Sequence, residues 1–181
     1  MSRLLLPADR DAPNYIVDTD KQLEAAMRHF YAFLTEQGGY AGCDAPYHLD
    51  ARAGDFAAIQ HALTMSQGES GVDWEFATTI DLCPQLDPKQ RPTQLRILSH
   101  DGVRGPIVYY LVNTAAQREA TLRLLFRQHQ DQGMYDRIEP YYPEYKAALA
   151  GDFAAIEAIL ADRRNADLPW YIITAVDPCT L

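Results

Sequence analysis

The sequence predicts an α/β or α+β protein in which one unit occurs twice in tandem. The six residues GDFAAI occur at residues 54–59 and again at residues 151–156. Two further blocks also agree, in the same order and at offsets of 95 to 97 residues. In both copies, β-branched and aromatic runs alternate with helical patterns. Because three separate blocks match in order, chance is a poor explanation, and we interpret the chain as an internal repeat.

The two outer blocks show how far each copy extends. YIVDTDKQLEAAMR, from Tyr15, matches YLVNTAAQREATLR, from Tyr110. WEFATTIDLC, from Trp74, matches WYIITAVDPC, from Trp170. The matched positions share residue types that build strands and helices rather than one surface motif, so the copies are expected to share a fold.

The region between the copies predicts a linker. PQLDPKQRPTQ is rich in proline and polar residues, which is typical of a connecting segment. We therefore expect a first repeat at residues 1–84, a linker at residues 85–94 and a second repeat at residues 95–181. The repeats are expected to pack together as one globular domain, related by a pseudo-twofold.

Each copy is predicted to begin with two strands. RLLL and YIVDT open the first copy, and LRIL and IVYYLVNT open the second. These runs are apolar, and the second of each pair is rich in β-branched and aromatic residues. IVYYLV, and WYIITAV near the end of the chain, are almost unbroken apolar runs, which predicts strands covered on both faces.

A long helix is expected next in each copy. Thr19 precedes Gln22 by three residues, and Thr114 precedes Gln117 in the same way, which is the spacing of a capping box at a helix start. Further along both segments, a glutamate lies four residues before an arginine, the order that favours a helical ion pair. Gly38 and its counterpart follow a glutamine and supply the left-handed residue that ends a helix.

Two short helices and a strand are predicted to complete each copy. EYKAALAGDFAAIEAIL and its counterpart around residues 52–63 predict two short helices that turn at the glycine. Asp55 and Asp152 are placed to cap the second helix of each pair. The segments from Trp74 and Trp170 predict the last strand, with the tryptophans as core anchors.

Composition indicates a protein with a sizeable core in a reducing compartment. The 181 residues are 48% hydrophobic and 23% charged, which is sufficient for one compact domain or two small ones. The chain has three cysteines, an odd number, so reduced thiols in the cytoplasm are expected. No apolar run approaches the roughly 20 residues of a membrane helix. We expect a cytoplasmic protein that does not enter a membrane.

The charge of the chain is acidic and uneven. The net charge is −9, and residues 1–90 contain 6 basic and 14 acidic residues, against 10 and 11 in residues 91–181. Binding to nucleic acid needs clustered Lys and Arg to neutralise phosphates, so nucleic acid is not an expected partner. A basic protein is the expected partner, and any acidic patch should lie in the first half.

Catalytic chemistry has weak support in the sequence. It contains no phosphate-binding glycine loop, GxSxG, HExxH or paired CxxC motif. Cys43 and His48 lie close together, but their segment is acidic, which does not favour a reactive thiolate. Asp81 and Asp177 occur at the same place in both copies and are interpreted as parts of the shared fold. No catalytic residue, metal or cofactor is therefore predicted.

The most unusual feature is a tyrosine-rich, acidic segment between the long helix and the helical pair. It is YDRIEPYYPEY in the second copy and YAGCDAPYHLD in the first. Tyrosine gives a large contact area with a polar tip and is enriched at interface hot spots, while carboxylates speed encounter with a basic partner. The predicted partner-binding residues are Tyr141, Tyr142, Tyr145, Glu139, Glu144, Asp136, Tyr47, Asp44 and Asp50.

These features favour a small acidic protein-binding module. The leading hypothesis is an inhibitor, immunity or antitoxin type of protein that occludes a basic site on another protein. Three alternatives stay open. The first is a small enzyme with a site in the cleft between the repeats, using Asp81, Asp177, His48 or Cys43. The others are a nucleic-acid mimic and a structural protein that forms oligomers.

Overall fold

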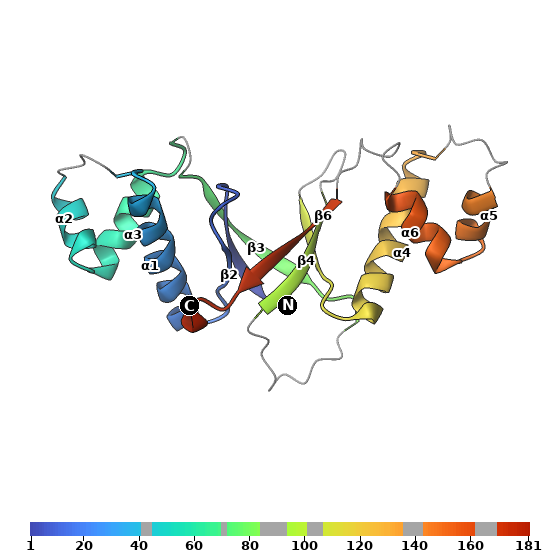
Figure 1. The fold of residues 1–181 in the computed structure, drawn as a ribbon, viewed down its shortest axis with the longest axis horizontal. Helices are drawn as coiled ribbons and strands as arrows, with labels where there is room; N and C mark the ends of the chain where they lie inside the picture. The colour runs from blue at the N-terminus through green and yellow to red at the C-terminus, as the bar shows by residue number, and fades with distance from the viewer. Residues whose placement is uncertain (41–44, 70–71, 84–93, 101–106, 136–142, 162–169) are drawn as a thin grey trace. The chain divides into compact units, whose positions relative to one another are not determined.

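The chain has a mixed α/β fold that combines α-helices with a closed six-stranded sheet (Figure 1). The computed structural model describes residues 1–40, 45–69, 72–83, 94–100, 107–135, 143–161 and 170–181. Six α-helices lie within these ranges. The order of strands around the sheet is β1-β2-β6-β4-β5-β3, and β3 pairs in turn with β1. The predicted α/β class is confirmed.

The order of elements is the same in the two halves of the chain. The first half contains β1 (Arg3–Pro7), β2 (Asn14–Ile16), α1 (Asp20–Glu36), α2 (Pro46–Arg52), α3 (Phe56–Met65) and β3 (Trp74–Ile80). The second half contains β4 (Gln94–His100), β5 (Val108–Leu111), α4 (Ala115–Asp131), α5 (Pro143–Leu149), α6 (Phe153–Ala161), β6 (Trp170–Val176) and a short 3-10 helix, η2 (Pro178–Thr180). The predicted order of strand, strand, long helix, two short helices and strand is confirmed. Of the predicted linker at residues 85–94, only Gln94 is described, and it begins β4.

The residues group into two compact units. The first unit comprises Met1–Thr79, Pro88–Leu95 and Ile173–Leu181, and the second comprises Ile80–Asp87 and Arg96–Ile172. Each unit thus contains a short segment from the opposite half of the sequence. In the first unit this is the start of β4 and the end of β6 with η2, and in the second unit it is Ile80 at the end of β3 with the residues that follow.

The sheet of the first unit combines antiparallel and parallel pairing. Strand β1 pairs antiparallel with both β2 and β3. Strand β2 pairs in parallel with β6, and Tyr15 lies opposite Val176 in that register. The packing of η2 on α1 continues this contact beyond the strand, and Pro178 of η2 is buried. The end of β6 is therefore an integral part of the first unit.

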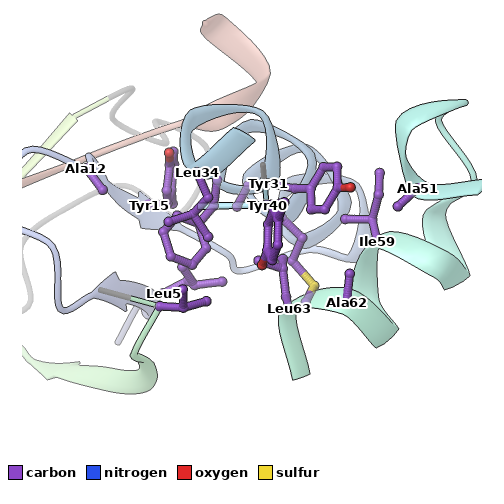
Figure 2. Close-up of a cluster of buried hydrophobic side chains, with 14 of the residues drawn as sticks. Leu5, Ala12, Tyr15, Tyr31, Leu34, Tyr40, Ala51, Ile59, Ala62 and Leu63 are labelled. Carbon is purple, nitrogen blue, oxygen red and sulfur yellow. The ribbon is translucent and has the colours of Figure 1, made fainter. Parts of the chain in front are cut away.

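Helix α1 begins at the predicted capping box and covers the first unit's core. The side chain of Thr19 accepts a hydrogen bond from the Gln22 amide, and the Gln22 side chain accepts one from the Thr19 amide. Two otherwise unpaired amides are therefore satisfied at the helix start. Figure 2 shows side chains from β1, α1 and α3 turned towards one another, among them Leu5, Leu34 and Leu63. This apolar cluster is the core on which α1, α2 and α3 are placed.

The second unit has the same kind of helix cap and apolar core. Thr114 and Gln117 form the capping box of α4, with hydrogen bonds in both directions. Leu122, Leu125 and Phe126 of α4 are buried, and they pack with residues of β5, α5 and α6 in a separate apolar cluster. The second unit is therefore organised around its own core.

An arginine joins the long helix to the turn of the helical pair in each unit. Arg28 donates to Glu24 at 2.7 Å and to the carbonyl oxygen of Gly54 at 2.7 Å. Arg123 makes the same contacts to Glu119, at 2.7 Å, and to the carbonyl of Gly151, at 2.8 Å. The predicted ion pairs are confirmed, and the same guanidinium also contacts the turn.

Glycine is required at this turn because of its backbone conformation. Gly54 has φ of 93° and Gly151 has φ of 91°, in the left-handed region that residues with a Cβ rarely adopt. Asp55 and Asp152 follow, and their carboxylates accept hydrogen bonds from the amides of Ala58 and Ala155. Both predicted N-caps are confirmed, and the helical pairs owe their geometry to the sequence GD.

One prediction about the strands is wrong. WYIITAV forms β6, but this strand is not covered on both faces, since Tyr171 is 50% exposed and Ile172 is 37% exposed. An unbroken apolar run therefore did not indicate a fully buried strand here. In β5, Tyr109, Tyr110 and Leu111 are all buried, as predicted. Within the described residues, no helix is both apolar enough and long enough to cross a membrane.

Candidate protein-binding surface

The described part of the predicted partner-binding set lies on α2 and α5. Tyr47 and Asp50 belong to α2, and Glu144 and Tyr145 belong to α5. The other predicted residues, and Cys43 of the alternative enzyme site, lie outside the described residues: Asp44, Asp136, Glu139, Tyr141 and Tyr142.

Helix α2 presents a carboxylate to solvent while its tyrosine packs inwards. Pro46 occupies the first turn, where a missing amide proton has no cost. Tyr47 is half-buried against the core, and its ring centroid lies 4.9 Å from that of His61. Asp50 is exposed, as is Leu49 at 55%. No hydrogen bond or ion pair within the described residues involves the Asp50 carboxylate.

Helix α5 shows the same division between its tyrosine and its carboxylate. Tyr145 is half-buried, with its ring centroid 5.7 Å from Tyr135 and 6.3 Å from Phe126. Glu144 is exposed in the first turn, where the positive end of the helix dipole favours a negative charge. The two described tyrosines therefore help to cover the cores, whereas the carboxylates are available to a partner.

Tyrosines that occur in both copies are core residues. Tyr40 and Tyr135 are 2% and 3% exposed. Tyr40 stacks on Tyr31 at a centroid distance of 5.1 Å, and Tyr135 stacks on Phe126 at 5.2 Å. Their rings close the end of each core next to the long helix, so they are not candidates for partner contact.

Sequence analysis missed two histidine–tyrosine pairs. His129 is buried, and its Nδ1 lies 3.1 Å from the Tyr135 hydroxyl. Burial, followed by the neighbouring Tyr145, raises the pKa of Tyr135 above its ordinary value. In the first unit, the Tyr15 hydroxyl lies 3.3 Å from Nδ1 of His29, and burial raises the pKa of Tyr15 to about 12. The two pairs use different positions of the repeat, so the matched blocks gave no signal for them.

The Tyr135 hydroxyl is expected to contribute to stability through His129. Tyr135→Phe should lower the free energy of unfolding by about 1–3 kcal/mol, because a buried ring nitrogen loses this partner. Urea unfolding measures the change, with Tyr171→Phe as the control, since Tyr171 is half exposed. The residue of the first copy that corresponds to His129 is Leu34, so His129→Leu introduces the side chain found there. A smaller cost when His129→Leu is added would confirm the coupling, and additive costs would contradict it.

The matched Asp and Cys positions have structural roles. The Asp81 carboxylate accepts from the Cys83 amide at 3.0 Å and from Nε2 of Gln117 at 3.1 Å. The Asp177 carboxylate accepts from the Cys179 amide at 3.0 Å. Asp81 belongs to the second unit and Asp177 to the first. Both carboxylates stabilise the turns that follow the last strands.

Metal binding finds no support in the described residues, which contain no group of three or more His, Cys, Asp or Glu side chains placed to hold an ion.

The tryptophans act as core anchors, as expected. The indole nitrogens of Trp74 and Trp170 donate to the carbonyls of Leu63 and Leu160, at 3.4 Å and 3.1 Å.

Besides Asp20 in the first turn of α1 and Glu75 on β3, the exposed carboxylates of the first unit fall into two groups. Asp18, Asp55 and Asp73 accept hydrogen bonds from backbone amides and so stabilise the fold. In the other group, the carboxylates take part in no hydrogen bond or ion pair within the described residues. We name this group the unpaired acidic set: Asp11, Glu36, Asp50 and Glu69.

The position of Glu36 indicates that these carboxylates are not present because they stabilise the fold. It lies in the last turn of α1, which contains no basic residue. A negative charge there opposes the helix dipole by about 0.3–1 kcal/mol.

No family model, curated protein or solved structure matches this chain. The functional conclusion rests on the chemistry of the chain itself.

Proposed function

We propose that the protein is an acidic binding module that occupies a basic site on a partner protein, as an inhibitor or immunity protein does. The observation that carries the proposal is the unpaired acidic set of the first unit. These carboxylates are exposed, and neither a cap nor an ion pair among the described residues accounts for them. Uncompensated charge on a folded surface favours encounter with an oppositely charged partner.

The mechanism follows from charge complementarity and steric occlusion. Lys and Arg side chains of the partner would pair with the carboxylates at the rim of the contact, which raises the association rate. Leu49, exposed beside Asp50 on α2, gives the same helix an apolar contact. The partner's basic site would then be covered, and its own ligand excluded. The cytoplasm is the proposed location, and the free thiols of Cys83 and Cys179 are consistent with it.

We also infer that the chain is a tandem duplication. The capping boxes, the arginine contacts and the GD turns recur at offsets of 95 to 97 residues. The cyclic strand order is unchanged when β1, β2 and β3 are exchanged with β4, β5 and β6. These regularities support the inference, and the pseudo-twofold relation stays a prediction. Features that both copies share are explained by the common fold, so function is assigned to features that differ between them, such as the excess acidity of the first copy.

Affinity capture from the native cell extract tests the binding proposal. The wild type is compared with Glu36→Gln/Asp50→Asn/Glu69→Gln, which removes three charges of the unpaired acidic set. We expect a stoichiometric basic partner that is retained by the wild type and whose association rate falls about tenfold or more in the variant at low salt. The effect should shrink as salt screens the charges.

A charge-matched control separates the surface from net charge. Asp131→Asn removes one charge from an exposed carboxylate of the second half and should leave capture unchanged. It is compared with Asp50→Asn, which removes one charge of the unpaired acidic set. Equal loss in both variants, or no partner at any salt, would overturn the proposal. A captured partner that binds DNA or RNA through the same site would identify the protein as a nucleic-acid mimic.

A further inference from the structure

His48 is a buried histidine within a cluster of aromatic rings in the first unit. It is 3% exposed and lies on α2. Its ring centroid is 4.7 Å from that of Tyr40, four residues beyond the end of α1, and 4.6 Å from that of Tyr47 on α2. Tyr47 in turn contacts the ring of His61 on α3. His48 therefore lies in the aromatic cluster through which α2 contacts Tyr40 and α3.

The hydrogen bonding of His48 suits only a neutral ring. Its Nδ1 is buried and has no hydrogen-bond partner among the described residues. A neutral imidazole tolerates this arrangement, because one of its nitrogens carries no proton. An imidazolium carries protons on both nitrogens, so a buried N–H without an acceptor would be created together with a buried charge.

The charged groups around His48 act in opposite directions. Arg52 of α2 is held nearby, since its Nη2 donates to the Tyr40 carbonyl at 2.9 Å. Glu69, which follows α3, is the opposing carboxylate. The other titratable groups of the cluster are Tyr31 from α1, Tyr40 from the segment after α1, Tyr47 from α2 and His61 from α3. Burial first, and then Arg52, lower the pKa of His48 from its ordinary 6.5, against the effect of Glu69.

At the position that matches His48, the second half of the chain has a residue that gains no proton near neutral pH. Tyr145 lies 97 residues after His48, and it also packs on aromatic rings at the start of a short helix. A tyrosine stays neutral across the range in which histidine gains a proton. The two helical pairs thus share their GD turn and arginine contact, but only the first has a histidine at this position.

We propose that the first unit contains an acid-sensitive switch, in which protonation of His48 loosens α2 from Tyr40 and from α3 while α5 keeps its place. The inference concerns the fold itself and stands whether or not Asp50 contacts a partner. If α2 is part of the partner surface, mild acid would also weaken that contact. The change is a proton uptake by one ring nitrogen from solvent, and no bond to carbon is made or broken.

The direction of the pH effect follows from proton linkage. The folded state holds His48 with a pKa below that of the unfolded chain, so unfolding of α2 takes up a proton. The stability that this group contributes is fully present above about pH 6.5 and is lost as the pH falls towards the folded pKa. Opening of α2 should become about tenfold easier for each pKa unit that separates the two states.

Amide hydrogen exchange provides a test with an internal control. The amides of Ala53, Gly54 and Asp55 donate to carbonyls of α2, and those of Ala150, Gly151 and Asp152 donate to the matching carbonyls of α5. Protection factors, which correct for intrinsic exchange, are measured between about pH 7 and about pH 5. We expect protection to fall at the first three positions and to stay constant at the second three.

Two variants identify the titrating group. His48→Tyr introduces the residue of the matching position, and His48→Phe removes the ionisable group without a hydroxyl. In either variant the α2 amides should become as insensitive to pH as those of α5. His61→Gln removes the exposed histidine of the same cluster and should retain the wild-type response. Parallel loss of protection in α2 and α5 of the wild type, or loss of the response in His61→Gln, would overturn the proposal.

Discussion

A chain that ends at Ile172 is expected to lose the folded state of the first unit, although it retains every residue of β1, β2, β3 and α1–α3. The deletion removes Ile173–Leu181, which belongs to the first unit. Val176 packs against the core of that unit, Ala175 is fully buried and Pro178 is buried on α1. Their loss exposes apolar surface and the unpaired edge of β2. For a domain with about 5–15 kcal/mol of net stability, a loss of several kcal/mol is decisive.

Hydrogen exchange of α1 and α4 measures this effect. The amides of α1 should lose most of their protection in the shortened chain, and the helical circular dichroism should fall with them. A chain ending at Thr180 is the matched control, because Leu181 is 63% exposed and its removal should leave stability unchanged. Wild-type protection of α1 in the chain ending at Ile172 would show that the end of β6 is dispensable for this unit.

Phe30→Ala is expected to cause the largest loss among point substitutions. Phe30 is fully buried on α1 and belongs to the core cluster of the first unit. Removing its ring loses the transfer free energy of the aromatic group and leaves a cavity, which together cost about 3–5 kcal/mol. Urea unfolding followed by circular dichroism gives the free energy, and the midpoint should move while the slope is retained.

Two further variants place this value in context. Leu125, which lies 95 residues after Phe30, is fully buried in the second core, so Leu125→Ala should cost about 2–5 kcal/mol. Met65 is 59% exposed at the end of α3, so Met65→Ala should change stability by less than about 0.5 kcal/mol. A cost below 1 kcal/mol for Phe30→Ala would contradict the packing described for α1.

The local elements were predictable because their signals lie within a few residues of one another. The capping box at Thr19 and Gln22, and the turn at Gly54, depend on contacts between near neighbours in sequence. Backbone geometry alone fixes which residue types serve there. The same reasoning placed the helical ion pairs, although it did not reveal that Arg28 also contacts the Gly54 carbonyl, a contact 26 residues away.

The candidate site was only partly predictable. Tyrosine-rich composition indicated contact surface, but Tyr47 and Tyr145 are half-buried on the cores. Tyr47 packs on His61 of α3, and Tyr145 packs on Phe126 of α4. The acidity of the first half was evident from the sequence, and Asp50 is exposed without an ion pair among the described residues.

By itself, the sequence determined the order of elements, the caps and turns that delimit them, and the acidity of the first half. These depend on local hydrogen bonds and on composition. Only the tertiary structure decided that the residues after β3 pack in the second unit, where Asp81 meets Gln117, and that η2 packs on α1 in the first. It also decided that His48 is buried. The reason is that a strand can pair with any compatible edge, so the closure of the sheet selects partners that no local pattern specifies.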